Sequence, residues 1–451
     1  MRVIIIGAGF GGLCLANGLL QRHRSDDDDM NMDIQVFERH SGPDHDLAGY
    51  GLHVDGDGKK ALRHCLDGDT YRRFLAASTP AGSKWAFRGT RDLGTIAVRD
   101  DSKISGKPEE EVERRAVHRF EFRDILLKGL RKQGDEAAIG VKVQVHWGKS
   151  FVRYEEISRA DANANGNEFV NGSVRAYFQD GTSAEGDILV GADGSKSLVR
   201  QQRFPDLTRE DLGIAIICGR YQLTPDRVKK LPDFMTDGSL NNIVPRGKGW
   251  LFLASFPHTE FENVRESYTL WAYVVPKGDV DMNTIKQMTP EKMRDLVLDG
   301  VKGWKSTELG LGRVIKDVDL TTISPIILKS MPVLPKDWNG SSKVVLLGDS
   351  IHNMTPMAGV GANVALRDAH LLTDTLVEVQ NGKTNMTEAI TKYEVEMKGY
   401  ANAAVALSRQ IAQGASSTST VQRWAFHGLL RLAQACLLVM RHTIGRGALE
   451  D

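Results

Sequence analysis

The order of apolar and polar residues along the chain is typical of an α/β protein. Residues 2–6 form a β-branched run that ends at a glycine, as a buried parallel strand does. Residues 11–21 carry leucine and alanine at helical spacing, and residues 34–38 form a second apolar run. The chain therefore opens with a strand, a helix and a second strand that we expect to run parallel to the first.

The middle of the chain changes to a pattern of longer strands. Residues 141–154 and 173–190 alternate between apolar and polar side chains, with turn signals between them. Residues 213–223, 243–256 and 267–276 are strand-like and rich in aromatics. The polar stretch 155–172 reads as the loop at a hairpin tip. We therefore expect one α/β domain that is interrupted by a largely antiparallel β-rich domain.

Helices are predicted at 119–130, 386–412 and 419–441, and a further strand at 344–348 leads into a helix that runs through Leu376. The segment from Trp424 to Met440 is apolar and could lie on a membrane. Few basic residues flank a polar face there, so a helix packed on the first domain is favoured. No stretch reaches the ~20 apolar residues that span a bilayer.

Composition and charge exclude several classes of function. The 451 residues fit two or three domains, and 58 basic residues balance 58 acidic ones, so no global field favours nucleic acid or an anionic membrane. The acidic run 26–29 lacks the pattern of a calcium loop and predicts a solvated loop, so no metal is expected. The four cysteines have no zinc or disulfide spacing, which predicts reduced thiols and a cytoplasmic protein.

Residues 7–12 read Gly-Ala-Gly-Phe-Gly-Gly and fit the pattern G-x-G-x-x-G between a strand and a helix. Glycine permits a tight turn, and the helix N-terminus beyond it presents free N–H groups to a pyrophosphate. Glu38 ends the second strand, where a carboxylate can accept ribose hydroxyls. This pattern predicts a bound dinucleotide but does not distinguish NAD from FAD.

Two further strands end in glycine and aspartate. Within residues 187–200, an apolar strand ends at the turn Gly191-Ala192-Asp193-Gly194. Within residues 344–352, a second apolar strand ends at Gly348-Asp349. Pro356, Gly359, Gly361 and Asn363 then precede the next helix. An acid at a strand end can bind hydroxyls, and a glycine-rich turn before a helix can bring N–H groups to an anion or a polar ring edge.

These three ordered motifs resemble the FAD-dependent aromatic-hydroxylase superfamily, the group A flavin monooxygenases of the para-hydroxybenzoate hydroxylase type. Arg119-x-x-Phe122-Arg123-x-x-Leu126 is similar to the R-x-x-L-R-x-x-L helix start of that family, and the resemblance covers roughly residues 1–400. It implies a Rossmann-like FAD-binding domain interrupted by a mixed or antiparallel substrate domain. The implied boundaries are 1–75, 116–205 and 336–400 for FAD, 76–115 and 206–335 for substrate, and 401–451 for C-terminal helices.

The resemblance also implies which positions contact FAD. The glycine loop would lie against the pyrophosphate, Glu38 and Arg39 at the adenosine ribose, and Asp349 at the ribityl chain. The segment 49–52 would run beside the flavin, and Asp193 would brace the fold. The implied contacts are Gly7, Gly9, Gly12, Glu38, Arg39, Gly51, Arg119, Asp349, Pro356, Gly359, Gly361 and Asn363.

Each of these positions has a purely structural alternative. Asp349 could be only a helix N-cap, Arg119 could form a surface ion pair, and His352 is more readily a packed histidine than a base. The catalytic group is not identified, and the candidates are His53, Arg220 and Tyr221. Trp250, Phe252, Phe256, Trp271 and Tyr273 could line a dry pocket or form plain core.

In the resembling family NAD(P)H reduces FAD, and a flavin C4a-hydroperoxide then transfers one oxygen atom from O2. The resemblance thus implies a single-component monooxygenase acting on an aromatic or conjugated small molecule, a secondary metabolite. The alternatives are an FAD-dependent epoxidase, a Baeyer–Villiger-type oxygenase or an oxidative cyclase on the same fold. An NAD-dependent dehydrogenase fits less well because of the two strand-end aspartate motifs.

Overall fold

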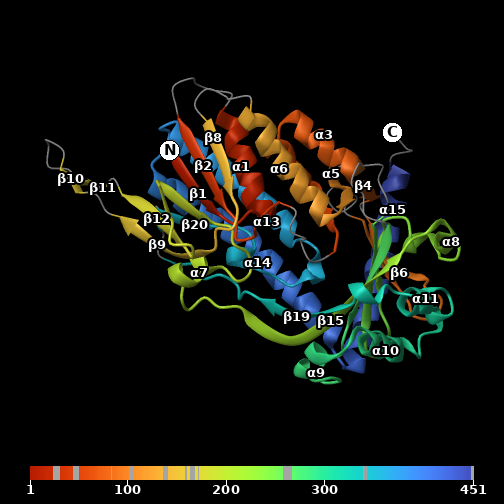
Figure 1. Ribbon diagram of the computed structural model, residues 1–451. Coiled ribbons are helices and arrows are strands. Elements are labelled where there is room, and N and C mark those ends of the chain that lie inside the picture. The colour runs from red at the N-terminus through yellow and green to blue at the C-terminus, as the bar shows by residue number, and fades with distance from the viewer. Residues whose placement is uncertain are drawn as a thin grey trace. The chain divides into compact units, whose positions relative to one another are not determined.

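The computed structural model in Figure 1 describes residues 1–23, 31–43, 50–82, 84–100, 106, 108–135, 141–157, 160–162, 168–170, 172–256, 267–338, 341 and 343–447. The acidic run 26–29 and Gly49 lie outside these residues. The chain forms two compact units. The first unit comprises Met1–Ala77, Val117–Glu210 and Lys329–Arg409, and the second comprises Ser78–Ala116, Asp211–Leu328 and Gln410–Asp451.

A parallel five-stranded sheet forms the centre of the first unit. The strand order is β20-β14-β1-β2-β8, and every neighbouring pair is parallel. Strands β20, β14, β1 and β2 are short, mostly apolar and largely buried because helices cover a parallel sheet on its faces, whereas the edge strand β8 alternates with polar residues and is not buried. Their bounds are β1 Arg2–Ile6, β2 Met32–Phe37, β8 Val141–His146, β14 Ile188–Gly191 and β20 Val344–Leu346.

Helices α1, α2, α6 and α13 pack together beside this sheet (Figure 1). Helix α1 contacts each of the other three, and its leucine and alanine face is fully buried. Helix α2 begins after Asp55, whose side chain accepts the N–H of Gly58 as an N-cap. The bounds are α1 Phe10–His23, α2 Gly56–Cys65, α6 Arg119–Asp135 and α13 Gly361–Gln380.

The remainder of the first unit comprises a small antiparallel sheet, in the order β13-β12-β9, the long helix α14 and several short elements. Strands β10 and β11 pair within the stretch 155–172 that was expected to be a loop, so that prediction was wrong in part. The bounds are β3 Leu52–Val54, α3 Gly68–Ala77, β9 Phe151–Ile157, β10 Ala160–Ala162, β11 Glu168–Val170, β12 Ser173–Phe178, β13 Ser183–Gly186, α7 Leu198–Arg203, α12 Asp349–His352 and α14 Met386–Ser416.

A seven-stranded mixed sheet, in the order β19-β15-β18-β17-β16-β5-β6, organises the second unit. Strand β16 pairs parallel with β5, while β15, β18, β17 and β16 pair antiparallel in turn. Of the strand-like stretch expected at 243–256, residues 250–256 form β17, Ile243 ends β16, and residues 244–249 connect the two strands. The bounds are β5 Lys84–Arg88, β6 Thr95–Asp100, β15 Glu210–Gln222, β16 Leu240–Ile243, β17 Trp250–Phe256, β18 Tyr268–Val274 and β19 Ser324–Ser330.

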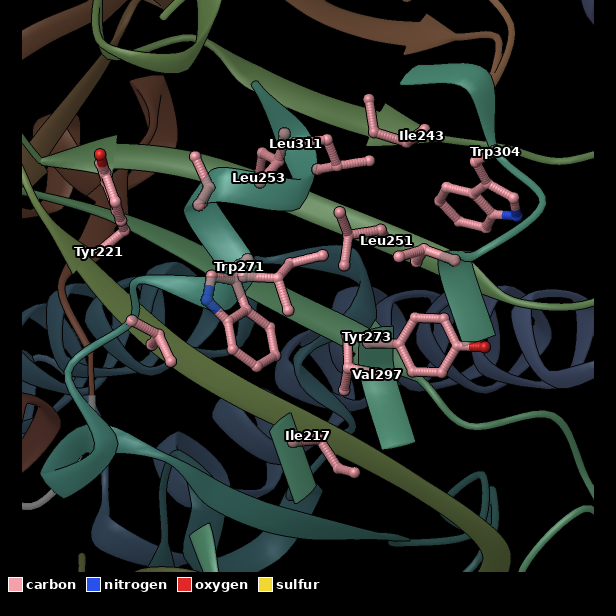
Figure 2. Close-up of a cluster of buried hydrophobic side chains, with 14 of the residues drawn as sticks. Ile217, Tyr221, Ile243, Leu251, Leu253, Trp271, Tyr273, Val297, Trp304 and Leu311 are labelled. Atoms are coloured by element: carbon pink, nitrogen blue, oxygen red, sulfur yellow. The ribbon is translucent and has the colours of Figure 1, made fainter. Parts of the chain in front are cut away.

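One face of this sheet is buried against helices α10 and α11. Figure 2 shows Trp271 and Tyr273 of β18 within this apolar cluster, together with Leu251, Val297 and Leu311. Trp250, Phe252 and Phe256 alternate with the core residues of β17 and therefore point to the opposite face. The remaining elements of the second unit are β4 Thr79–Gly82, α5 Glu109–Val112, β7 Arg114–Val117, α8 Pro225–Val228, α9 Met282–Gln287, α10 Pro290–Val301, α11 Leu311–Lys316 and α15 Thr420–Gly447.

Helix α15 packs on the second unit. The ring of Phe426 lies 5.6 Å from that of Trp250 and 6.2 Å from that of Phe87, and the side chain of Gln434 accepts the N–H of Val98. The helix was expected on the first domain, so this placement differs from the prediction. Within the described part of the chain, no helix combines the length and apolar character that a membrane span needs.

The fold class expected from the sequence is therefore confirmed. A parallel sheet with helices is interrupted along the chain by a mixed sheet, and long helices follow at the C-terminus. Cys14, Cys65 and Cys218 are free and buried.

Candidate functional site

The three motifs predicted from the sequence meet at one edge of the parallel sheet. Gly7 follows β1, Asp193 follows β14 and Asp349 follows β20, and these strands are neighbours. Backbone hydrogen bonds continue the strand pairing into the turns. The N–H of Ala192 donates to Ile6 O at 2.8 Å, and the N–H of Leu347 donates to Gly191 O at 3.1 Å. Ligands of open α/β sheets bind at this carboxyl edge.

The glycine loop is shaped by its close contact with the neighbouring turn. Gly7 has a φ of 109°, and a Cβ atom there would lie 2.3 Å from Ala192 O. A Cβ atom at Gly12 would lie 2.3 Å from Gly7 O, so both glycines are needed for the turn itself. Gly9 is exposed, and a Cβ atom there would meet nothing within 4 Å. The loop thus leaves open space directly before the N-terminus of α1.

Glu38 holds this loop through a hydrogen bond to its backbone. Its side chain is 7% exposed, and its Oε2 atom accepts the N–H of Ala8 at 2.8 Å. Its other oxygen accepts the N–H of His40 at 3.1 Å. Two backbone donors already hold the carboxylate in place, and its contact with a ribose stays a prediction. Arg39, the next residue, is exposed.

Two arginines of α6 lie beside the glycine loop. The guanidinium of Arg119 lies 5.8 Å from the centre of the Phe10 ring, at the start of α1. Arg123 is 2% exposed, and its Nε atom donates to Ala8 O at 3.2 Å. Burial lowers the pKa of Arg123, while the charge of Glu38 raises it. Among the described residues the Nη1 atom of Arg123 has no hydrogen-bond partner, so a buried donor is left unpaired next to the loop.

The turn after β20 is fixed by a residue that the sequence analysis did not single out. Gly348 has a φ of 62°, and its N–H donates to Oδ2 of Asp368 at 2.6 Å. Asp368 also pairs with His352, and both side chains are fully buried. Asp349 follows Gly348 directly. It is exposed and is the first residue of α12. The signal that could have found Asp368 is its charge on an otherwise apolar helix face, which needs a buried partner.

His352 therefore lies in a fully buried pair, as the packed alternative expected. Burial lowers its pKa, but the charge of Asp368 and the hydrogen bond to it raise the pKa by more, so the net pKa stands above its ordinary value. With no exposed surface, this imidazole is not placed to exchange protons with a bound molecule.

The glycine-rich turn before α13 is in part exposed and in part structural. Pro356 and Gly359 are exposed, and Gly361 is half-buried. Asn363 is 4% exposed; its amide nitrogen donates to His53 O at 3.0 Å, and its oxygen accepts the N–H of Asp55 at 3.1 Å. The Asn363 side chain thus holds the segment that follows Gly51, while its contact with a cofactor stays a prediction.

Asp193 braces the start of α7. Its Oδ2 atom accepts the N–H of Leu198 at 2.8 Å, and burial raises its pKa. Arg200, one turn further on, donates to Ser350 O at 2.9 Å and so links the second strand-end motif to the third. This arrangement agrees with a role in the fold for Asp193.

The three candidate catalytic residues are divided between the two units. His53 is half-buried on β3 in the first unit. Arg220 and Tyr221 are neighbours on β15 in the second unit, so their side chains point to opposite faces. Tyr221 is fully buried in the core of Figure 2, where burial raises the pKa of its hydroxyl. The guanidinium of Arg220 lies 4.9 Å from the centre of the Tyr268 ring on the other face.

Known proteins match this chain along most of its length. The family described as FAD binding domain matches residues 322–408. A crystal structure from Photorhabdus luminescens subsp. laumondii, described as a candidate FAD-containing monooxygenase, is 36% identical, has a TM-score of 0.75 and covers 92% of this chain and 98% of that one. The chain belongs to the FAD-dependent monooxygenases of the para-hydroxybenzoate hydroxylase type.

Relatives of this FAD-dependent monooxygenase include two fungal enzymes. The dual O-methyltransferase/FAD-dependent monooxygenase CTB3 of Cercospora beticola is 29% identical over 422 residues, which is 88% of this chain and 44% of that protein. The 6-methylsalicylate 1-monooxygenase atA of Aspergillus terreus is 25% identical over 379 residues, which is 82% of this chain and 73% of that protein. The chain thus spans less than half the length of CTB3.

The residues at the sheet edge fit FAD, the cofactor of this monooxygenase. The open space at Gly9 and the N-terminus of the 14-residue helix α1 suit a pyrophosphate. The buried, unpaired Nη1 atom of Arg123 adds a positive charge beside it. Asp349 lies exposed two strands away, where a polyol chain could reach it. The identity of the individual contact residues remains a prediction.

Proposed function

We propose that this monooxygenase uses NAD(P)H and O2 to insert one oxygen atom into an aromatic or conjugated small molecule, a secondary metabolite. The observation that carries the proposal is the convergence of the glycine loop and Asp349 at one edge of the parallel sheet, where Ala365, at the start of α13, lies beside Gly348. When bound there, FAD supplies the transfer of electrons from NAD(P)H to O2 and the delivery of the oxygen atom. The protein supplies position and exclusion of water.

The second unit offers an aromatic face for such a substrate. Strand β18 turns Trp271 and Tyr273 into the core, and β17 places Phe252 and Phe256 on the opposite face, where Phe426 of α15 already packs against Trp250. The rings of Phe256 and Tyr268 stack there at 5.1 Å. Flat apolar rings favour a flat aromatic ligand and keep its surroundings dry.

Arg220 is a charged residue on this aromatic face. Its guanidinium lies against the Tyr268 ring, while its neighbour Tyr221 is in the core. A guanidinium beside aromatic rings can bind a carboxylate or a phenolate through paired N–H groups. The relative 6-methylsalicylate 1-monooxygenase is named for a substrate with both groups. We therefore assign Arg220 to substrate binding and prefer it to Tyr221 as a site residue.

The test uses the purified protein with FAD bound. Flavin reduction by NADH and by NADPH is followed without oxygen, with and without a panel of hydroxybenzoates and larger phenols. We expect one or more of these compounds to accelerate reduction and, in ¹⁸O2, to yield a product that carries one labelled oxygen atom. A product that has lost two hydrogen atoms and carries no labelled oxygen would show that the enzyme catalyses a dehydrogenation or an oxidative cyclisation instead of oxygenation. A protein that takes up no FAD would overturn the proposal.

A further inference from the structure

Two histidines and an aspartate meet on the first unit, away from the strand-end motifs. His64 ends α2, and His370 and Asp374 are one turn apart on α13. The Nε2 atom of His64 lies 2.6 Å from Oδ1 of Asp374, and that of His370 lies 3.5 Å from Oδ2. One ligand atom from each residue lies within 4.8 Å of the other two. None of the predicted FAD contacts belongs to this group.

We propose that His64, His370 and Asp374 bind one divalent transition-metal ion, with Zn²⁺ as the reference ion. Two imidazoles and one carboxylate are a ligand set that zinc accepts, with a fourth position left for water. Tetrahedral bonds of about 2.0–2.2 Å place ligand atoms about 3.3–3.6 Å apart. The separation of 3.5 Å between His370 and Asp374 lies within that range, and the separation of 2.6 Å between His64 and Asp374 is shorter.

The burial of the three side chains suits an ion that enters from solvent. The side chains of His64 and His370 are 18% and 21% exposed, while that of Asp374 is 48% exposed. The two imidazole rings lie 3.8 Å apart, centre to centre. Two protonated rings at that distance repel each other, whereas one shared metal ion needs both rings neutral.

Asp374 is already the acceptor of both histidines. Partial burial opposes its charge, but hydrogen bonds from His370 and His64 outweigh burial and hold the pKa of Asp374 well below its usual range. The carboxylate is therefore ionised at neutral pH and ready to act as a ligand.

Arg22 of α1 competes with the metal ion. Its Nη2 atom lies 2.5 Å from Nδ1 of His64 and 3.1 Å from Nε2. A zinc-bound histidine normally donates its second N–H to an acceptor, and a guanidinium is only a donor. Metal binding therefore requires Arg22 to leave His64, so removal of this guanidinium strengthens metal binding.

The metal ion would join α2 to α13 at a second point. Asn363, in the first turn of α13, already holds the backbone of Asp55 just before α2. His64 and Asp374 lie near the other end of the same two helices. A metal bridge there stabilises the pair of helices that positions the segment around His53, and it raises the melting temperature of the folded protein.

The experiment measures Zn²⁺ binding to the full-length, FAD-loaded protein after the affinity tag and bound metals are removed. Equilibrium dialysis at about pH 7.5 is followed by elemental analysis. We expect one Zn²⁺ per chain in the micromolar range, and a melting temperature that rises with Zn²⁺ until the site is full.

The variants give changes of opposite sign. His370→Asn and Asp374→Asn each weaken Zn²⁺ binding at least about tenfold, whereas Arg22→Ala strengthens it. Asp124→Asn removes a comparable carboxylate that is paired with Lys128 one turn away on α6, and leaves binding unchanged. Binding that is absent in the wild type, unchanged in Asp374→Asn, or weakened by Arg22→Ala would overturn the proposal. Flavin reduction is measured separately, so its failure and the failure of metal binding are distinguishable.

Discussion

The Nε2 atom of His352 lies 2.6 Å from the Oδ2 atom of Asp368, and neither side chain is exposed. The same oxygen accepts the N–H of Gly348, and the other carboxylate oxygen accepts the hydroxyl of Tyr400 at 2.7 Å. One buried carboxylate therefore connects the turn after β20, the short helix α12 and the long helix α14. The predicted ribityl contact, Asp349, lies on that turn.

Replacement of Asp368 should unfold the cofactor edge of the first unit. Asp368→Ala leaves the N–H of Gly348 and the imidazole of His352 buried without this acceptor, and it removes the acceptor of the half-buried Tyr400 hydroxyl. Loss of one partner from a buried pair costs about 3–5 kcal/mol. We expect a correspondingly lower free energy of unfolding in urea, with loss of FAD in the same transition. Asp337→Ala, which removes an exposed carboxylate of the same unit, is the control and should change little. Equal urea midpoints of unfolding for Asp368→Ala and Asp337→Ala would contradict the role given to Asp368.

The pair also predicts how stability depends on pH. Burial lowers the pKa of His352, Asp368 raises it by more, and the net value in the folded state is above the ordinary 6.5. A raised pKa contributes stability that is fully present below the unfolded value and is lost as the pH rises through the folded value. The difference in melting temperature between wild type and His352→Gln should therefore shrink as the pH rises above about 6.5. A difference that grows with pH would contradict this assignment.

Features encoded by neighbouring residues could be predicted from the sequence. The β-branched run before Gly7 and the glycines after it specify the first strand and its turn, because both depend on residues only a few positions apart. The three strand ends met as expected since parallel strands present their carboxyl ends at one edge. Asp368 could not be assigned in this way, because its partners Gly348 and Tyr400 are 20 and 32 residues away.

The aromatic sheet shows the same limit. Alternation along β17 and β18 predicts that neighbouring residues face opposite ways, but not which face is covered. Helices α10 and α11, which follow later in the chain, bury the face of Trp271 and Tyr273. Helix α15 was placed on the wrong domain for a similar reason. Its apolar residues, such as Phe426, indicate that it packs, while its partner Trp250 is far away in sequence.

Asp349→Ala should lower FAD occupancy without unfolding the chain. The side chain is exposed at the N-terminus of α12, and no hydrogen bond to it is found among the described side chains, so the fold does not depend on it. Loss of one charged hydrogen bond to the cofactor weakens FAD binding by roughly tenfold or more. Flavin absorbance per folded chain measures the effect, with Asp337→Ala as the matched control. Full flavin retention would remove Asp349 from the site.

The glycines of the loop should separate folding from cofactor binding. A Cβ atom at Gly12 would lie 2.3 Å from Gly7 O, so Gly12→Val disrupts the turn and lowers both stability and FAD content. At Gly9 a Cβ atom meets nothing within 4 Å, so Gly9→Ala keeps the melting temperature of the FAD-free protein but fills the space before α1. We expect Gly9→Ala to bind FAD more weakly at unchanged apoprotein stability. Unchanged FAD affinity in this variant would place the pyrophosphate elsewhere.

Arg220→Met should weaken the binding of acidic substrates while FAD binding remains intact. Arg220 lies on the aromatic face of the second unit, 4.9 Å from the Tyr268 ring, and methionine keeps much of its apolar stem without the charge. Loss of a paired charge raises KM for hydroxybenzoates by roughly tenfold or more, and it changes KM little for a neutral phenol. Arg227→Met is the matched control, because Arg227 also stacks on a tyrosine, at 4.8 Å, but that tyrosine is the buried Tyr221. If the two variants discriminate equally between acidic and neutral substrates, the charge of Arg220 does not select the substrate, and the aromatic face alone must do so.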